Sequence, residues 1–208
     1  QSASSDLLQI ELKAARRVYQ LKMLISAFSF DRQVGEVLEL KKLIQENTGS
    51  FTKEATAWTE ELVTKLSTLH DTSCRFHQWL EGQFQTTLLP EENPVLLERL
   101  QKASSHFAQE AESVITFINK PAMVTDSRQQ ANEVNELLKD LFAGLSQAIH
   151  LYKGFNGSLD TDSWHQRRRS FVLPFYSINV YAGVSSAVTE SSSHPELYNA
   201  LKKQRDVY

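Results

Sequence analysis

Residues 51–89 read FTKEATAWTEELVTKLSTLHDTSCRFHQWLEGQFQTTLL, and they decide the fold class of the chain. The stretch contains no proline and a single glycine, Gly82. Its large apolar residues recur at steps of three and four, which places them on one stripe of an α-helix: Phe51, Ala55, Trp58, Leu62, Leu66, Leu69, Phe76, Leu80, Phe84 and Leu88. A continuous helix over this range would be about 58 Å long, longer than a small globular core needs. The stretch therefore predicts the spine of an elongated helical bundle.

The composition supports an all-α class and restricts the kinds of partner. Of the 208 residues, 41% are hydrophobic, which is enough for a sizeable core. The seven glycines and five prolines mostly separate helical patterns, which disfavours the loop-rich β classes. With 22 basic and 25 acidic side chains the net charge is −3. Any contact with a nucleic acid would therefore have to be local.

The sequence carries no sign of a membrane or of secretion. No apolar run approaches the length of a transmembrane helix, and the N-terminus lacks a basic segment followed by an apolar one. The single cysteine, Cys74, fits a reducing compartment, so we expect a cytoplasmic protein. Because the sequence starts at Gln1 and ends at Tyr208 within a helical pattern, we also expect it to be a piece of a longer protein.

Along the chain, caps and breaks separate the helices of the predicted bundle. The first helix would turn its apolar residues inward, namely Leu8, Leu12, Ala15, Val18, Tyr19 and Ile25. Long helices joined by short turns run antiparallel to their neighbours, and the first two helices would form a shorter layer alongside. The predicted helices span residues 6–28, 31–44, 51–89, 94–119 and 126–154.

The character of the sequence changes after the bundle, which we assign to residues 1–155. Residues 156–193 would contain a short helix with Trp164 inward, an extended segment over 171–184 and a polar linker. Pro174 breaks any helix there, and Phe175, Ile178, Val180 and Tyr181 favour extended chain that must find a partner or lie on the bundle. A last helix would begin at Pro195, in a third segment that spans 194–208.

One group of side chains has the spacing of a metal site. His70, Cys74 and His77 stand at i, i+4 and i+7, so they share one helical face, and thiolate with imidazole suits zinc. A fourth ligand would have to come from elsewhere, with His106 and His150 as candidates. The structural interpretation is stronger, because Leu69 and Phe76 already occupy the core stripe and leave the three on its flank. We therefore predict no metal and no cofactor in this chain.

Two basic clusters are the candidate nucleic-acid-binding residues. Arg167, Arg168 and Arg169 follow Trp164, and guanidinium groups beside an aromatic ring can hold phosphates and stack on a base. Lys202, Lys203 and Arg205 form a second and weaker cluster. The alternative for both is a solvated linker or helix face. No Walker-type loop or nucleophile elbow is present, so no catalytic residue is predicted.

The C-terminal stretch carries a resemblance to a known domain. Residues 194–208, HPELYNALKKQRDVY, resemble the first helix of the helicase-and-RNase-D C-terminal (HRDC) domain, with Leu197 and Leu201 on its apolar face and Arg205 as its arginine. Residues 89–100, LPEENPVLLERL, and the opening stretch from Leu7 to Arg32 precede it in the chain. This order is similar to the region after the motor in Pif/RecD-like superfamily 1 DNA helicases of gut Bacteroidetes.

The resemblance implies a parent that unwinds DNA with ATP and magnesium bound to its motor, whose motifs are absent from this sequence. We therefore expect a non-catalytic accessory domain that positions the HRDC domain and guides DNA. Its partners would be DNA and the helicase motor domain. The alternative is a purely structural or dimerising helical module without nucleic-acid binding. A helical enzyme is disfavoured because no catalytic set is present.

Overall fold

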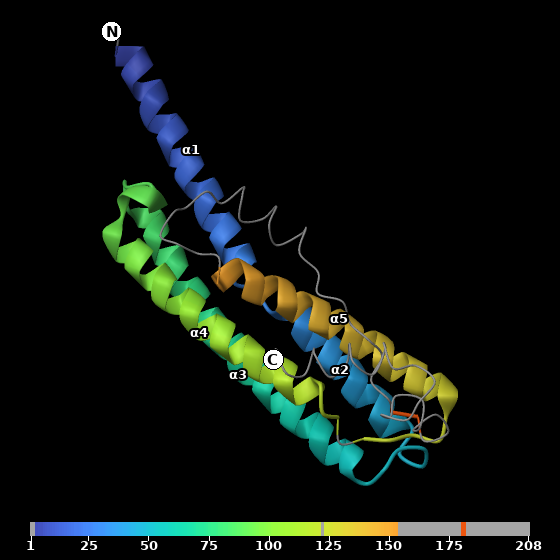
Figure 1. Ribbon diagram of the computed structural model, residues 1–208. Coiled ribbons are helices and arrows are strands. Elements are labelled where there is room, and N and C mark those ends of the chain that lie inside the picture. The colour runs from blue at the N-terminus through green and yellow to red at the C-terminus, as the bar shows by residue number, and fades with distance from the viewer. Residues whose placement is uncertain (1–2, 122, 154–179, 182–208) are drawn as a thin grey trace, which may run out of the picture.

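The computed structural model describes residues 3–121, 123–153 and 180–181, and within them the chain is an all-α bundle, as predicted. Figure 1 shows its shape, which is elongated along the long helices. The described part contains no strand, only two isolated β-bridges, and none of its helices has the length and apolar character to cross a membrane. The helices are α1 (Ala3–Ala27), α2 (Asp31–Glu46), α3 (Glu54–Gly82), α4 (Pro94–Ile118) and α5 (Arg128–Lys153), with two 3-10 helices, η1 (Gln83–Gln85) and η2 (Pro90–Glu92).

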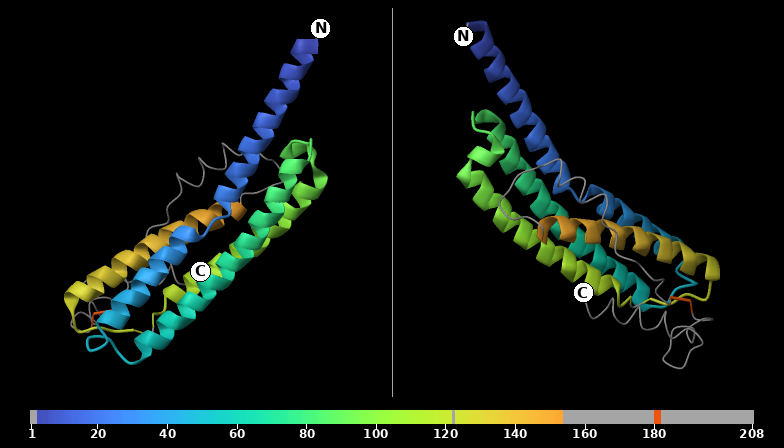
Figure 2. Two further views of the ribbon diagram at one scale, coloured as in Figure 1. Left: turned by 180° about the vertical axis from the view of Figure 1, so that it is seen from behind. Right: turned by 45° about the horizontal axis from the view of Figure 1, so that its top comes forward.

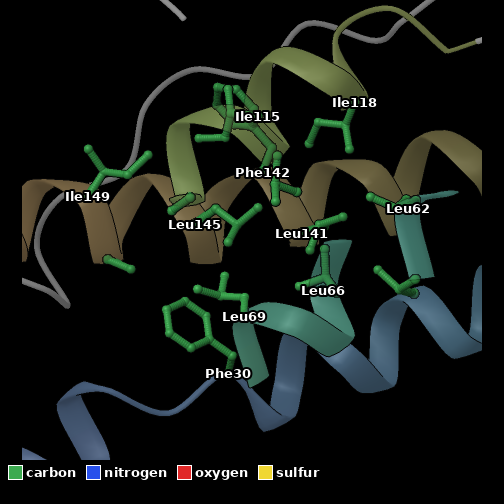
Figure 3. Packing of buried hydrophobic residues seen from close by; sticks show 14 of the residues in the cluster. Phe30, Leu62, Leu66, Leu69, Ile115, Ile118, Leu141, Phe142, Leu145 and Ile149 are labelled. Atoms are coloured by element: carbon green, nitrogen blue, oxygen red, sulfur yellow. The ribbon is translucent and has the colours of Figure 1, made fainter. Parts of the chain in front are cut away.

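Four of these helices form the bundle proper. Each of α2, α3, α4 and α5 packs against two neighbours, in the order α3, α4, α5, α2 and back to α3. Consecutive helices are adjacent because the connections between them are short, which is the up-down arrangement of simple bundles. Figure 3 shows side chains of α3, α4 and α5 converging on the bundle axis, among them Leu66, Ile115 and Phe142. All three are at most 1% exposed.

The predicted spine is α3, but it is shorter at both ends than residues 51–89. Phe51 forms an antiparallel bridge with Thr125, which keeps the start of the stretch extended. After Gly82 the chain tightens into η1, and Thr86 is extended with φ −82° and ψ 158°. Leu88, placed on the stripe by its spacing, is 43% exposed, whereas Leu89 is buried. The prediction for this end was wrong because apolar spacing continues past the point where the helix stops.

The start of α4 follows its sequence signals. The Oδ1 atom of Asn93 accepts a hydrogen bond from the backbone N–H of Leu96 at 3.2 Å, and Pro94 takes the first helical position, as predicted. The backbone N–H of Leu89 donates to the carboxylate of Glu92 at 3.1 Å, which closes the turn of η2. Together these bonds turn the chain sharply between the antiparallel helices α3 and α4.

The first helix does not lie where the apolar pattern placed it. Its buried residues are Gln20, Leu21, Leu24 and Ala27, all in its C-terminal third. Leu8, Leu12 and Tyr19, predicted to face inward, are 53%, 55% and 49% exposed. Figures 1 and 2 show why, since the N-terminal half of α1 extends beyond the bundle and past the loop that joins α3 to α4. The periodicity identified a helix but could not reveal that no neighbour within the bundle covers its first half.

Backbone pairing ties three parts of the chain together at the opposite end of the bundle. The N–H of Thr52 donates to the carbonyl of Val124 at 2.8 Å, and the N–H of Thr125 donates to the carbonyl of Val180 at 2.7 Å. Val180 is fully buried and Tyr181 forms a parallel bridge with Thr125. These two residues are therefore extended and paired. The predicted helix around Trp164, the linker and the last helix lie outside the described residues.

Candidate functional site

The basic residues singled out from the sequence lie outside the described part of the structure. They are Arg167, Arg168 and Arg169 in the first cluster and Lys202, Lys203 and Arg205 in the second. Their role in binding nucleic acid stays a prediction. The described helices nevertheless contain four features that bear on function: a histidine and cysteine cluster, a junction between α1 and α2, the exposed half of α1, and a basic groove between α3 and α4.

The three candidate metal ligands of α3 do not converge. His70 lies with Nδ1 3.3 Å from the Asp31 carboxylate and Nε2 3.5 Å from the sulfur of Cys74. His77 turns to the other side, with Nε2 3.2 Å from the carbonyl oxygen of Phe28 and 3.3 Å from the hydroxyl of Ser73. Among the described residues, no group of three histidine, cysteine or acidic side chains is placed to hold a metal ion. His106, considered as a fourth ligand, lines the basic groove of α4 instead.

His77 belongs to a set of contacts that fixes the junction between α1 and α2. The hydroxyl of Ser73 donates to the carbonyl of Phe28, and the hydroxyl of Tyr152 donates to the carbonyl of Ala27 at 3.0 Å. The Phe28 ring stacks on the Tyr152 ring at 4.8 Å and meets the Phe76 ring edge-on at 5.0 Å. Carbonyls left unpaired where a helix ends are thus satisfied by α3 and α5. These contacts therefore hold the junction in the core, where Ala27 and Phe28 are at most 1% exposed.

Beyond this junction, the projecting half of α1 has apolar side chains on two opposite sides. Ile10 continues the stripe of Leu21 and Leu24 at steps of three and four, but it is 66% exposed. Leu8 and Leu12 lie on the other side and are also more than half exposed. Two ion pairs hold the middle of the helix to η2, from Lys13 to Glu92 at 3.0 Å and from Arg16 to Glu91 at 2.8 Å, and Lys13 lowers the pKa of Glu92.

A hollow of about 250 Å³ opens between α3 and α4. We call this hollow the α3–α4 groove. Its polar rim consists of Thr72 and Arg75 from α3 and of Arg99, Lys102 and His106 from α4. Phe76 and Phe107 form its buried floor. Residues 72, 75, 76 and 79 share one face of α3, and residues 99, 102, 103 and 106 share one face of α4, because both sets step by three and four.

The two arginines of the groove are held in place but not neutralised. Nη2 of Arg75 donates to the hydroxyl of Thr72 at 3.3 Å, and the guanidinium of Arg99 lies over the Trp79 ring at 5.6 Å from its centre. Within the described part of the chain neither guanidinium has a carboxylate at salt-bridge distance, whereas Lys102 pairs with Glu98 at 3.2 Å. The groove therefore has an excess of positive charge on an otherwise acidic chain.

The groove was not predicted from the sequence, because its basic residues do not follow one another along the chain. Arg75 and Arg99 belong to different helices, and the turn through η1 and η2 brings these helices together. One signal in the sequence could have predicted the groove. Basic residues recur at helical spacing on one face of each of two helices that are predicted to be antiparallel neighbours.

The comparisons with known proteins give one finding. Residues 11–169 match the family described as the middle domain of DNA helicases, which is more than half of the chain. No curated protein and no solved structure matches the chain. The match covers the whole four-helix bundle, the junction and most of α1, and it agrees with an accessory region of a helicase. The chain therefore belongs to the DNA helicase middle domain family.

Proposed function

We propose that the chain is a non-catalytic domain of an ATP-dependent DNA helicase that holds neighbouring domains in fixed relative positions and guides a DNA strand. The observation that carries the positioning role is α1, which projects from the bundle with apolar residues on two sides and is fixed at its base. Membership of the DNA helicase middle domain family supports the helicase context.

The exposed apolar sides of α1 indicate the kind of partner that covers it. A helix that is apolar on more than one side is normally enclosed by other protein. Leu7 and Ile10 extend the stripe that packs on the bundle, whereas Leu8 and Leu12 lie opposite, and each is more than half exposed. A partner that covers both sides must bring more than one element, so we assign α1 to the folded motor domain of the same helicase.

The finer parts of the proposal come from the sequence. Residues 194–208 resemble the start of an HRDC domain, so the domain would lie between the motor and that domain in a Pif/RecD-like helicase of the Bacteroidetes type. Arg167, Arg168 and Arg169 lie between the bundle and this segment in the chain. We propose that they contact DNA phosphates without sequence preference, because phosphate contacts carry affinity and no base information.

The test uses the full helicase that contains this domain. Changing Leu8 and Leu12 to glutamate places charges on the face assigned to the motor, so we expect DNA unwinding to fall by at least about tenfold while ATP hydrolysis by the motor continues. Leu38→Glu is the matched control, because Leu38 is 50% exposed on α2 and lies away from α1's projecting half. Unwinding at the wild-type rate by the double variant would contradict the positioning role.

A second experiment separates this proposal from a dimerising module. Leu8, Leu12, Ala15 and Tyr19 recur at steps of four, three and four, as in a short coiled-coil seam, so self-association is the specific alternative. Sedimentation of the isolated chain over a wide concentration range measures it. The dimerising module would be favoured over the motor contact if the mass of the wild-type chain doubles as the concentration rises. The variant with both Leu8→Glu and Leu12→Glu should then keep the mass of a monomer.

A further inference from the structure

We infer that the α3–α4 groove binds the phosphate backbone of a single nucleic-acid strand and stacks a base beside Trp79. This assignment rests on the proposed DNA-guiding role and gives that role a site within the described bundle, distinct from Arg167, Arg168 and Arg169. It follows from the charge of the groove, from its volume and from the aromatic rings in and beside it.

The positive charge of the groove favours binding of an anionic ligand. Arg75 and Arg99 are exposed, face the same hollow and have no carboxylate at salt-bridge distance within the described part of the chain. A planar guanidinium donates two parallel N–H bonds to a phosphate, and Arg is the residue preferred for this recognition. His106 adds a donor on the same rim, as does Lys102, which pairs with Glu98 at 3.2 Å. Several other basic side chains, in contrast, pair with carboxylates of this chain: Lys13, Arg16, Arg32 and Lys153.

The small volume of the groove favours one strand. The hollow lies between two neighbouring helices of one hairpin and measures about 250 Å³. This space admits a phosphate and part of a sugar, whereas a duplex would touch only the outer rim. The cationic groups also come from both sides of the hollow, Arg75 from α3 and Arg99 from α4, so a strand lying along it would meet positive charge on either side.

The aromatic rings favour a nucleic acid over an acidic segment of protein. Trp79 is partly buried beside the groove, with the Arg99 guanidinium 5.6 Å and the parallel Phe76 ring 6.0 Å from its centre, so a base would meet the part of the Trp79 ring that these two groups leave open. Proteins that bind single strands combine a basic groove with aromatic side chains on which bases stack. The His106 ring is exposed at the same rim and meets the Phe107 ring at 5.7 Å. A peptide rich in aspartate and glutamate has no aromatic ring to stack on them.

The test measures binding of a fluorescently labelled single-stranded oligonucleotide to the full chain by anisotropy at several salt concentrations. Changing Arg75 and Arg99 to glutamine should weaken binding about tenfold at low salt and reduce the salt slope by about 1.4 units, as expected for two phosphate contacts on a single strand. Lys42→Gln with Lys139→Gln is the control, because both lysines are exposed on other helices and the net charge changes equally. The control should change the affinity by less than about twofold.

Two further measurements test whether the groove prefers a single strand and whether a base stacks beside Trp79. A duplex of the same length, and separately a polyglutamate peptide, should each compete at least about tenfold less well than the unlabelled single strand. In a Trp164→Phe background, binding should quench Trp79 fluorescence, and Trp79→Phe should remove most of the quench, since Trp58 is 4% exposed and stacks on Phe117. Equal competition by the duplex or by the peptide would overturn the ligand proposed for the groove.

The outcome also separates this inference from the DNA-guiding role on which it rests. If Arg167→Ala, Arg168→Ala and Arg169→Ala together abolish binding while the Arg75 and Arg99 variant binds normally, the groove is not the site and the guiding role stands. If the wild-type chain binds neither the single strand nor the duplex at low salt, the groove and the guiding role are both wrong. Melting temperatures of the groove and control variants should stay within a few degrees of wild type, because the changed residues are exposed.

Discussion

At the scale of single residues, Glu36 is the side chain whose protonation is most clearly altered by folding. Burial raises its pKa to about 7, and the nearby carboxylates of Asp140 on α5 and Glu39 act in the same direction. The guanidinium of Arg32, whose Nε lies 3.2 Å from Glu36, opposes the shift. One carboxylate oxygen of Glu36 is buried without a hydrogen-bond partner. Glu36 therefore holds its proton more tightly in the folded chain than in the unfolded one.

This shift predicts how stability changes with pH. Because the folded pKa lies above the ordinary value of 4.5, the contribution of Glu36 is fully present at low pH and is lost as the pH rises through about 7. We expect the free energy of unfolding to be lower at pH 8 than at pH 5.5 by about 1–2 kcal/mol from this group, since its side chain is 13% exposed and solvent screens part of the shift. Urea denaturation at the two pH values measures it.

Two variants isolate the role of Glu36. Glu36→Gln should remove most of the difference between the two pH values and make the protein more stable than wild type at pH 8. Glu46→Gln is the control, since Glu46 is exposed on the same helix, is not among the groups that shift the pKa of Glu36 and should leave the difference unchanged. A pH dependence that is the same in the Glu36→Gln variant and in the wild type would rule out the assignment.

A second residue-scale feature is the close approach of α2 to Gly144 of α5. A methyl group at position 144 would meet the side-chain amide of Gln33, which is 3% exposed, whereas one at Gly35 would meet nothing within 4 Å. Alanine in a helix is favoured over glycine by about 1 kcal/mol. We expect Gly35→Ala to gain about this amount, and Gly144→Ala to be at least about 1 kcal/mol less stable than Gly35→Ala because the buried amide must move.

Thermal or urea unfolding of the two glycine variants gives the comparison directly, since each protein carries the same chemical change in a helix. Equal gains at both positions would show that Gln33 moves without cost. Adding Gln33→Ala to Gly144→Ala should restore part of the gain, which identifies the amide as the source of the difference.

At the scale of elements, α1 is buried against the bundle at its C-terminal end and exposed at its N-terminal end. Its last turns are buried, with Leu21 and Leu24 at most 1% exposed, and Ala27 is hydrogen-bonded to Tyr152. Its first turns contribute no residue to the core, and a short helix without tertiary packing is only marginally stable in water. In the isolated chain we therefore expect amides of residues 3–14 to exchange with solvent orders of magnitude faster than those of residues 21–27.

Hydrogen exchange followed by mass spectrometry or NMR measures this gradient, and the concentration of protein is the useful variable. Slow exchange over residues 3–14 at every concentration would contradict the view that the first half of α1 is not covered by the described bundle. Protection that rises with concentration would instead indicate that a second copy covers Leu8 and Leu12.

At the scale of the whole molecule, the sequence was sufficient to predict the all-α bundle and the residues that fill it. Leu62, Leu66 and Leu69 were predicted on the core stripe and are buried, because apolar spacing reports which side of a helix is apolar. Spacing does not report whether a partner lies alongside, which is why Leu12 was wrongly placed inside, and it does not report where a helix stops, which is why Leu88 was. The α3–α4 groove was missed for a related reason, since its basic residues meet only after the hairpin has formed.

Because α1 is attached to the core at Phe28, a small change in its direction at this junction produces a large movement at its N-terminal end. About 30 Å of helix separates Leu8 from Phe28, so a tilt of α1 by about 10° at the junction, which would also break its ion pairs with η2, moves Leu8 by about 5 Å, close to one helical turn. Such a rotation shifts the ring of Phe28 far less than it shifts the tip. A change in the bundle that is too small to break its core contacts would therefore displace the end of α1 by about one helical turn relative to a neighbouring helix.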